Sequence, residues 1–289
     1  MPKKQNAMTL KVFLLSLGCP RNANDSEVLL GLLKKKGVRL TEDAEKADIL
    51  VVNTCAFIRE AKEESIDAIL GLVSVKKSGK KLVVMGCLPQ RYSEELSRDI
   101  PEIDGIFGTA DIAGVSAFIE ARGEKQAKRK PGVPRFLYDH RYERDLITPA
   151  HFAYVKIQEG CMNNCSYCVI PSLRGPYRSR TLASLLREIR SLRNKSGVKE
   201  INLVGQDTTL YGIDRYGSSR AARLLEQTAA IMQDGWVRML YGHPAHFTDD
   251  IVSVIAECPA ICNYVDMPIQ HISDRILKRM RRKVTRKGI

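Results

Sequence analysis

The sequence predicts an α/β protein in two parts, an N-terminal parallel sheet flanked by helices and then a partial (β/α) barrel. Short β-rich runs alternate with helical stretches, and a basic, proline-containing segment interrupts the alternation near the middle. The 289 residues, 44% of them hydrophobic, suffice for two buried cores. The longest apolar runs are the length of a strand, far short of the roughly 20 residues that a membrane span needs.

Residues 1–122 contain alternating strand and helix candidates, which predict a parallel sheet covered by helices. In chain order these candidates are Val12–Leu17, Asp25–Lys36, Ile49–Asn53, Ile58–Lys77, Leu82–Met85 and Ser93–Asp99. A weaker unit runs from Gly105 to a helix that ends near Arg122. Asn24 or Asp25 is expected to cap the first helix, because short polar side chains are preferred at that position.

Residues 123–149 are interpreted as a linker, because the stretch GEKQAKRKPGVPRF is basic, contains proline and has no hydrophobic period. A second series of strands and helices follows in residues 150–289 and predicts the partial barrel. The strand candidates are Phe152–Gln158, Glu200–Val204, Trp236–Leu240 and Tyr264–Met267, and the helical stretches are Leu182–Arg193, Ser219–Gln233, Thr248–Glu257 and Ser273–Met280. Four such units cannot close a barrel, so we expect the chain to be C-terminally incomplete.

The N-terminus, MPKKQNAMTLK, lacks the apolar core and cleavage site of a signal peptide, which predicts a cytoplasmic protein. Because the cytosol keeps thiols reduced, the eight cysteines are expected to be metal ligands or buried thiols rather than disulfides. The formal net charge of +13 would suit a nucleic-acid partner, but residues 278–289 alone supply seven basic side chains and no acidic one. Charge alone therefore does not identify a partner.

Three cysteines crowd one loop directly after the first strand candidate of the second part. Cys161, Cys165 and Cys168, here called the loop triad, have C-x3-C-x2-C spacing and no adjacent histidine. A structural zinc site would need four ligands, whereas three thiolates on a four-iron cluster leave one iron open for an exchangeable ligand. The spacing favours a cluster that takes part in chemistry, with a zinc site or buried thiols as the alternatives.

Three further cysteines each follow a strand candidate of the first part. Cys19, Cys55 and Cys87, here called the strand-end triad, lie in Ser-Leu-Gly-Cys-Pro, Val-Asn-Thr-Cys-Ala and Met-Gly-Cys-Leu-Pro. Parallel strands place such loops along one edge of the sheet, where ligands gather in these folds. Each cysteine taken singly could be a small buried residue. At three equivalent positions, they predict a second three-thiolate cluster site.

The loop triad, with Tyr167 before its last cysteine, resembles the C-x3-C-x-aromatic-C signature of the radical S-adenosylmethionine (radical SAM) superfamily. The resemblance implies a 4Fe-4S cluster whose open iron binds the amino and carboxylate groups of S-adenosylmethionine. It also implies that Tyr167 lies beside the adenine of that cofactor. Gln206 and Asp207 stand where the family has a motif that touches the cofactor's amino group, although Gly-Gly-Glu is the common sequence there.

The two triads in this order resemble the methylthiotransferase family, which places an auxiliary cluster domain before a radical SAM domain. The resemblance covers essentially the whole chain. Ser16-Leu-Gly-Cys-Pro-Arg-Asn22, Gln206-Asp-Thr-Thr209 and Tyr211-Gly212 are similar to the branch that modifies an aspartate of a small-subunit ribosomal protein. The branch that modifies tRNA usually has Tyr-Gly-Cys-Gln-Met-Asn and Gln-Asn-Val, which this chain lacks.

The resemblance implies an enzyme that adds a methylthio group to the β-carbon of that aspartate. It would use two 4Fe-4S clusters and S-adenosylmethionine, with an external electron donor and a sulfur source as partners and no membrane partner. Methylthiolation of a tRNA adenosine is the nearest alternative and needs the same clusters. Alternatives from other classes are a two-cluster electron carrier or sensor, and a zinc-containing RNA-binding module.

Some polar residues near the predicted strand ends receive no role from the sequence. His243, His246 and His271 follow barrel strands, but a lone histidine on a loop is commonly a satisfied hydrogen-bonding group. Arg178 and Arg180 can bind a carboxylate or phosphate through two parallel hydrogen bonds, or can simply begin a solvated helix. Both interpretations stay open at this point.

Overall fold

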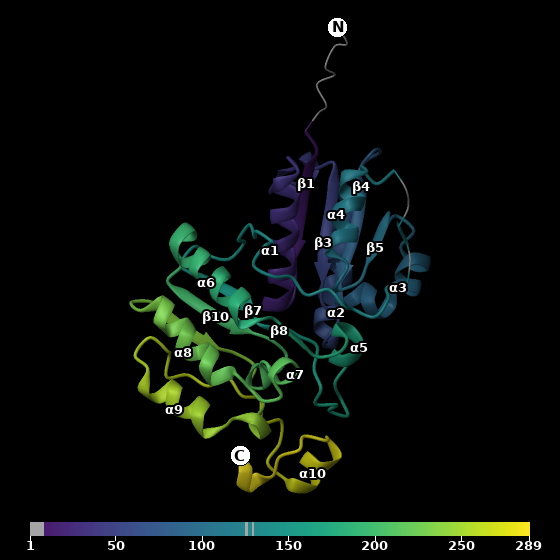
Figure 1. The fold of residues 1–289 in the computed structure, drawn as a ribbon. Coiled ribbons are helices and arrows are strands. Elements are labelled where there is room, and N and C mark those ends of the chain that lie inside the picture. The colour runs from purple at the N-terminus through teal and green to yellow at the C-terminus, as the bar shows by residue number, and fades with distance from the viewer. Residues whose placement is uncertain (1–8, 125–126, 129) are drawn as a thin grey trace. The chain divides into compact units, whose positions relative to one another are not determined.

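The computed structural model describes residues 9–124, 127–128 and 130–289 (Figure 1). The chain forms two compact units, one made of Met1–Gly132 with Glu143–Asp145 and the other of Val133–Tyr142 with Leu146–Ile289. The segment interpreted as a linker thus contributes to both units, and the domain limits 1–122 and 150–289 remain a proposal. Within the described residues, no helix is both long and apolar enough to span a membrane.

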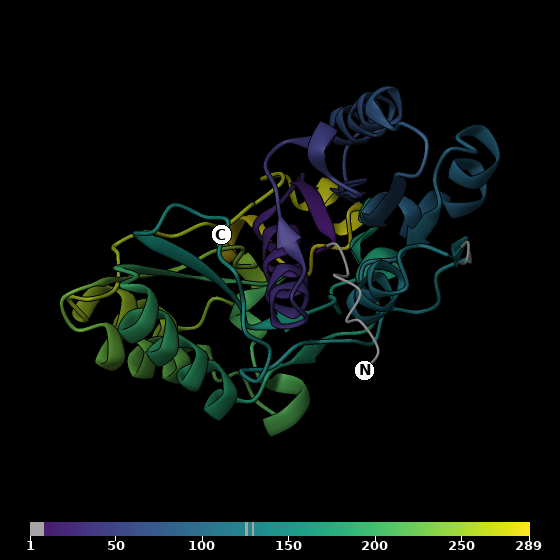
Figure 2. The same ribbon diagram turned by 90° about the horizontal axis from the view of Figure 1, so that it is seen from above.

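The first unit contains a six-stranded parallel sheet with the order β2-β1-β3-β4-β5-β6. Its strands are β1 (Lys11–Ser16), β2 (Arg39–Leu40), β3 (Ile49–Thr54), β4 (Lys81–Gly86), β5 (Gly105–Phe107) and β6 (Ala127–Lys128). Its helices are α1 (Pro20–Lys35), α2 (Arg59–Val75), α3 (Cys87–Asp99) and α4 (Ile112–Glu120), with α1 and α2 on opposite sides of the sheet (Figure 2). Because both faces are covered, β3 and β4 are buried almost throughout, which explains their nearly continuous apolar sequence.

Two helices of the first unit begin earlier than the sequence predicts. Helix α1 starts at Pro20 instead of Asp25, since the missing N–H of proline is not needed in the first helical turn. The predicted caps, Asn24 and Asp25, are wrong, because both residues lie inside the helix and are buried. Helix α3 starts at Cys87 instead of Ser93 and is kinked within its length. A cysteine therefore stands at the start of each helix, as the cap residue Cys19 before α1 and as the first residue of α3.

The second unit contains a three-stranded parallel sheet with the order β11-β10-β7. The strands are β7 (Phe152–Lys156), β10 (Glu200–Val204) and β11 (Trp236–Met239), and the helices are α5 (Ile170–Arg174), α6 (Leu182–Ser196), α7 (Ile213–Tyr216), α8 (Ala221–Met232), α9 (Asp249–Glu257) and α10 (Asp274–Arg279). Buried aliphatic side chains of the sheet pack against α6, α8 and α9 to form its core. The predicted fold class, a parallel-sheet α/β domain followed by a partial (β/α) barrel, is confirmed.

Two strand predictions in the second unit need correction. The strand expected at 152–158 divides after Lys156, because β8 (Gln158–Glu159) turns to pair antiparallel with β9 (Arg178–Ser179). The strand expected at Tyr264–Met267 does not form, and an isolated bridge between Val237 and Ile261 stands beside β11 instead. The side chains of Tyr264 and Val265 are about half exposed, so strand pairing at these residues is not stabilised by side-chain burial.

Candidate metal centres

The strand-end triad lies at the carboxyl ends of β1, β3 and β4, which are neighbours in the sheet. Cys19 precedes α1 as its N-terminal cap residue, Cys55 follows β3 directly, and Cys87 is the first residue of α3. Cys55 and Cys87 are buried, and Cys19 is partly exposed. The strand order thus brings the three predicted ligands to one edge of the sheet, with only part of the group open to solvent.

Asn22 ties the three cysteine loops together. Its side-chain amide donates hydrogen bonds to the carbonyl of Leu17 at 3.0 Å and to that of Thr54 at 2.9 Å. Its Oδ1 lies 3.9 Å from the Sγ of Cys87. Asn22 is fully buried, so one side chain in the first turn of α1 joins the ends of β1 and β3 and faces the third cysteine. The sequence interpretation gave Asn22 no structural role.

Gly18 allows the loop after β1 to approach Cys55 closely. The φ angle of Gly18 is +86°, and a Cβ atom built there would lie 2.8 Å from the Cβ of Cys55 and 3.3 Å from its Sγ. Contacts under 3.0 Å are essentially never seen for a real Cβ, so any side chain at position 18 would push the first two cysteine loops apart. The Gly-Cys sequence before α1 is therefore a geometric requirement of this edge.

The loop triad lies between β8 and α5, and its cysteines are all partly exposed. The backbone N–H of Cys168 donates to the carbonyl of Cys165 at 3.1 Å, which closes a tight turn between these two ligands. The N–H of Ile170 points at the Sγ of Cys168, 3.5 Å away. Burial raises the pKa of the Cys161 thiol, and nearby Asp207 raises it further. Among the described residues, each triad offers three thiols, a donor set that fits a cluster with one open iron.

The C-terminal segment holds the loop triad from the other side. Ser166 bonds the carbonyls of Met280 and Arg279 through its N–H and its hydroxyl, at 3.1 and 3.0 Å. Arg282 is 4% exposed, and its Nη1 donates to the Sγ of Cys165 at 3.8 Å while its Nη2 donates to the carbonyl of Pro268. A segment that the sequence presented only as a source of positive charge thus places a buried guanidinium against a predicted ligand.

Glu159, two residues before the loop triad, is a buried carboxylate in a network of cations. Its Oε2 lies 2.7 Å from the Nζ of Lys156 and 3.3 Å from Nη1 of Arg174, and its Oε1 accepts from the side-chain amide of Gln206. Burial by itself would raise the pKa of Glu159, but the charges of Lys156 and Arg174 outweigh it and lower the pKa to about 2. The carboxylate joins β7, α5 and the loop after β10 around the cysteines.

Asp207 is held by three donors and is almost fully buried. It accepts hydrogen bonds from Asn163 of the cysteine loop at 2.6 Å, from Thr209 at 2.5 Å and from Nδ1 of His246 at 2.8 Å. Burial opposes its ionisation, yet the His246 and Thr209 bonds keep its pKa below the ordinary value. His243 stacks on His246 with ring centroids 4.8 Å apart. Since the carboxylate is already satisfied by hydrogen bonds, we interpret this group as a positioning cluster and not as a metal site.

The three predicted cofactor contacts, in or near the loop triad, differ in whether their polar atoms or rings are free to bind a ligand. Tyr167 is 44% exposed, Asp207 is saturated by protein donors, and the Oε1 of Gln206 is buried without a hydrogen-bond partner. Both amide atoms of Gln158 and the Nε2 of His243 are likewise buried and unpartnered. Unpaired polar atoms in a protein interior are uncommon and indicate a polar ligand, so the residues at this sheet edge fit a bound S-adenosylmethionine. These contacts remain predictions.

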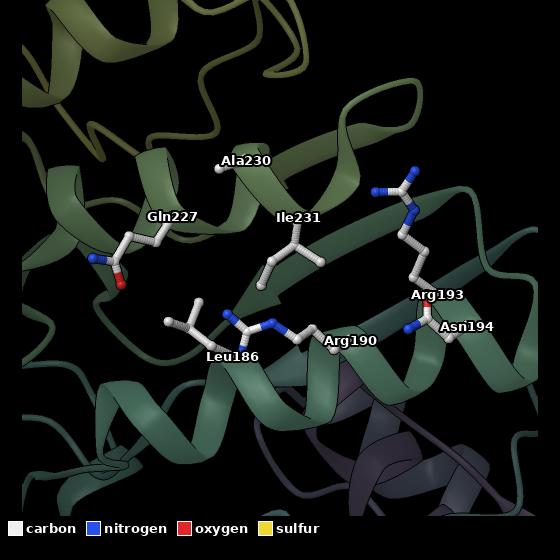
Figure 3. Close-up of a pocket in the computed structure, with 7 residues that line it drawn as sticks. All are labelled: Leu186, Arg190, Arg193, Asn194, Gln227, Ala230 and Ile231. Atoms are coloured by element: carbon white, nitrogen blue, oxygen red, sulfur yellow. The ribbon is translucent and has the colours of Figure 1, made fainter.

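The second unit also has a cavity of about 510 Å³ between α6 and α8, where Arg190, Arg193 and Gln227 extend from the two helices (Figure 3). Leu186 and Ile231 add apolar side chains to its lining. No cysteine, histidine or carboxylate lines it, so it has none of the groups that the chemistry of the triads needs.

Comparison with protein-family models assigns each unit separately. Residues 11–108 match the model described as "Uncharacterized protein family UPF0004", and residues 155–289 match the radical SAM superfamily. The first match contains the strand-end triad and the second contains the loop triad.

Curated proteins with high similarity share one name. "Ribosomal protein uS12 methylthiotransferase RimO" of Geobacter sulfurreducens is 50% identical over 278 residues, covering 95% of this chain and 62% of that protein. The protein of the same name from Clostridioides difficile is 46% identical over 282 residues, covering 97% of this chain and 63% of its own length. The chain therefore spans less than two thirds of the curated relatives that it matches.

Solved structures with similar folds are also radical SAM proteins. The methyltransferase TsrM from Kitasatospora setae, with tryptophan and a SAM analogue bound, has a TM-score of 0.63 at 16% identity, covering 97% of this chain and 62% of that one. The cobalamin-dependent S-adenosylmethionine radical enzyme OxsB has a TM-score of 0.56 at 10% identity, covering 97% and 46%. At these identities the likeness concerns the fold alone.

Proposed function

Because the chain belongs to the methylthiotransferase family within the radical SAM superfamily, we propose that it takes part in methylthiolation of ribosomal protein uS12. The observation that carries the proposal is the presence of two groups of three cysteines, one at the carboxyl ends of β1, β3 and β4 in the first unit and one between β8 and α5 in the second. One reducible cluster site would suffice for radical formation, whereas a second supports delivery of sulfur. The relatives' names favour uS12 over tRNA as the substrate.

In this proposal, Cys161, Cys165 and Cys168 hold a 4Fe-4S cluster, and Cys19, Cys55 and Cys87 hold a second one. The bound cluster and S-adenosylmethionine together supply one-electron cleavage of the cofactor, with the electron coming from an external donor. The chain's own part is to position these groups. Gln158 and Gln206 offer buried amide atoms to the cofactor, and Tyr167 offers a ring face.

The overall change replaces one hydrogen on the β-carbon of a uS12 aspartate with a methylthio group. When both groups are bound, the cofactor fragment would take up the hydrogen atom, and the second cluster site would supply the sulfur and accept the electron released as the carbon–sulfur bond forms. A second S-adenosylmethionine would supply the methyl group. A sulfur source restores the second site. We place this reaction in the cytoplasm, where the ribosomal substrate is made.

Mass spectrometry of two parallel reactions tests the proposal. The reconstituted protein is incubated anaerobically with S-adenosylmethionine, a reductant and either a uS12 peptide or tRNA. A mass gain of one methylthio group on the peptide aspartate supports the proposal, while a gain on tRNA alone would establish the tRNA alternative. Absence of 5'-deoxyadenosine in both reactions, despite a full iron content, would instead favour an electron carrier or sensor.

A further inference from the structure

A second cavity of the second unit, of about 630 Å³, has a strongly basic lining that the triads do not use. It lies among the segment 135–141, β9, the first turns of α6, and α7. We call it the arginine pocket, after the six arginines that line it: Arg135, Arg141, Arg178, Arg180, Arg187 and Arg215. Two aspartates, Asp139 and Asp214, are the acidic residues of the lining. The excess of guanidinium groups indicates an anionic ligand.

Two of the six arginines are neutralised inside the protein. Arg141 pairs with Asp139, whose oxygens lie 2.6 Å from its Nη2 and 3.0 Å from its Nε. Arg180 is buried and pairs with Glu188 at 2.5 Å, while its guanidinium lies over the ring of Tyr138. These two side chains are parts of the wall and are not available to a ligand.

The other four arginines have no carboxylate within ion-pair distance among the described residues. Arg215 donates to the carbonyl of Ser179, and Arg187 lies 3.2 Å from the Nε2 of His140. Arg135 and Arg187 are exposed at the mouth of the pocket. Their hydrogen-bond partners are neutral, so none of these four charges is compensated by a direct ion pair within the part of the chain that the structure describes.

Arg178, from β9, is the deepest of the four. It is partly buried, its Nη1 donates to the carbonyl of Pro176 at 2.6 Å and its Nη2 to that of Arg174 at 3.4 Å, and its Nε is buried without a partner. Burial lowers the pKa of Arg178 and the like charge of Arg135 adds to the lowering, while the charge of Glu159 opposes both. An anion bound between Arg178 and Arg135 would give both guanidinium groups a direct counter-charge. Arg178 lies in β9, before α6 begins, and is partly buried, so its interpretation as the solvated start of a helix is wrong.

We propose that the arginine pocket binds the phosphodiester backbone of RNA. Successive phosphates of one strand can be shared by the four uncompensated arginines, and guanidinium groups match phosphate oxygens through paired hydrogen bonds. The aromatic rings of the lining are engaged within the protein, since Tyr138 is buried under Arg180 and His140 contacts Ser184 and Arg187, so we expect a sequence-independent contact. RNA binding by the pocket does not depend on the proposed function. Only the identification of the RNA as the ribosomal RNA around uS12 rests on it. An acidic peptide is the other outcome that the test must separate.

Fluorescence anisotropy with a labelled single-stranded RNA of mixed sequence, titrated with the metal-free chain at several KCl concentrations, tests the proposal. The double variant Arg135→Gln and Arg187→Gln removes two exposed charges without touching either triad. We expect weaker binding at every RNA sequence and a salt-dependence slope that is smaller by about one per lost phosphate contact.

The matched control is Arg190→Gln with Arg223→Gln, which removes the same charge from exposed positions. Arg190 lies on the same helix as Arg187 but faces the other cavity (Figure 3). The control variant should bind RNA like the parent. An equal loss of RNA affinity in both double variants would show that net charge alone explains the binding, and it would overturn the proposal that the arginine pocket is the site. Competition by polyglutamate as strong as by unlabelled RNA, or by inorganic phosphate alone at similar charge concentration, would also overturn it. These outcomes are independent of methylthiotransferase activity.

Discussion

Glu159 illustrates how much depends on single buried charges beside the loop triad. The carboxylate, Lys156 and Arg174 are each almost completely inaccessible to water, so none of the three can lose a partner cheaply. Arg282 lies in a comparable environment, with its guanidinium against Cys165. Both residues act on the cysteine loop through geometry and charge rather than as ligands.

Glu159→Gln should destabilise the folded protein by about 3–5 kcal/mol, because Lys156 and Arg174 lose their buried counter-charge. The pKa of Glu159 is lowered to about 2 in the folded state, so its contribution is present above the ordinary value of 4.5 and is lost as the pH falls towards 2. Denaturant unfolding at several pH values should therefore show that acid lowers the free energy of unfolding of the parent by an amount that the variant does not lose. Glu226→Gln, on the exposed face of α8, is the control. An equal fall with acid in parent and variant would contradict this prediction.

Arg282→Gln should make the midpoint potential of a cluster reconstituted on the loop triad more negative. The positive charge and the hydrogen bond to Cys165 favour the reduced, more negative cluster. Loss of about 1 kcal/mol corresponds to roughly 40 mV for a one-electron couple. Redox titration followed by electron paramagnetic resonance measures the shift, and Arg282→Lys should recover part of it. A potential unchanged in both variants would show that Arg282 serves only to pack the C-terminal segment.

At the scale of elements, the carboxyl ends of β1, β3 and β4 come together around Asn22. The strands are parallel neighbours, so their carboxyl ends meet at one edge, but pairing alone does not set the spacing of the cysteine loops. Asn22 sets it by bonding the carbonyls of Leu17 and Thr54, and Gly18 permits the close approach. The early start of α1 at Pro20 places Asn22 where it can do this.

Asn22→Ala should leave the buried carbonyl of Thr54 and the partly buried carbonyl of Leu17 without this donor and lower the free energy of unfolding by about 2–3 kcal/mol. It should also reduce iron binding at the strand-end triad while leaving the loop triad loaded. Thermal unfolding measures the first effect, and iron analysis of Asn22→Ala in backgrounds that lack one triad or the other measures the iron held at each site. Lys35→Ala, at the exposed end of α1, should change neither. Full iron content in Asn22→Ala would show that the loops keep their spacing without this side chain.

At the scale of the whole molecule, each triad belongs to a different unit, and each unit matches a different family model. The second unit also carries the arginine pocket, and no cysteine is among the residues that line it. Cluster binding, cofactor positioning and anion binding therefore draw on different side chains and can be altered separately.

Replacement of Cys161, Cys165 and Cys168 by alanine should remove roughly half of the iron that an anaerobically reconstituted chain binds, if both sites hold like clusters. Replacement of Cys19, Cys55 and Cys87 should remove the other half. Colorimetric iron and sulfide analysis checks the stoichiometry, with Cys258→Ala and Cys262→Ala as a matched cysteine control. Unchanged iron in either triple variant would refute that site.

The sequence alone predicted the fold class and most of the longer strands and helices, picked out the two cysteine triads and indicated the family. These features follow from local hydrophobic period and from spacing within short segments, which the chain carries wherever it folds. Only the tertiary structure showed that Asn22 bonds β3, that Glu159 is enclosed by cations and that Arg282 reaches Cys165 from 117 positions away. It also showed that 264–267 forms no strand and that four uncompensated arginines share a pocket. Such contacts depend on burial and on partners distant in sequence, which no local pattern contains.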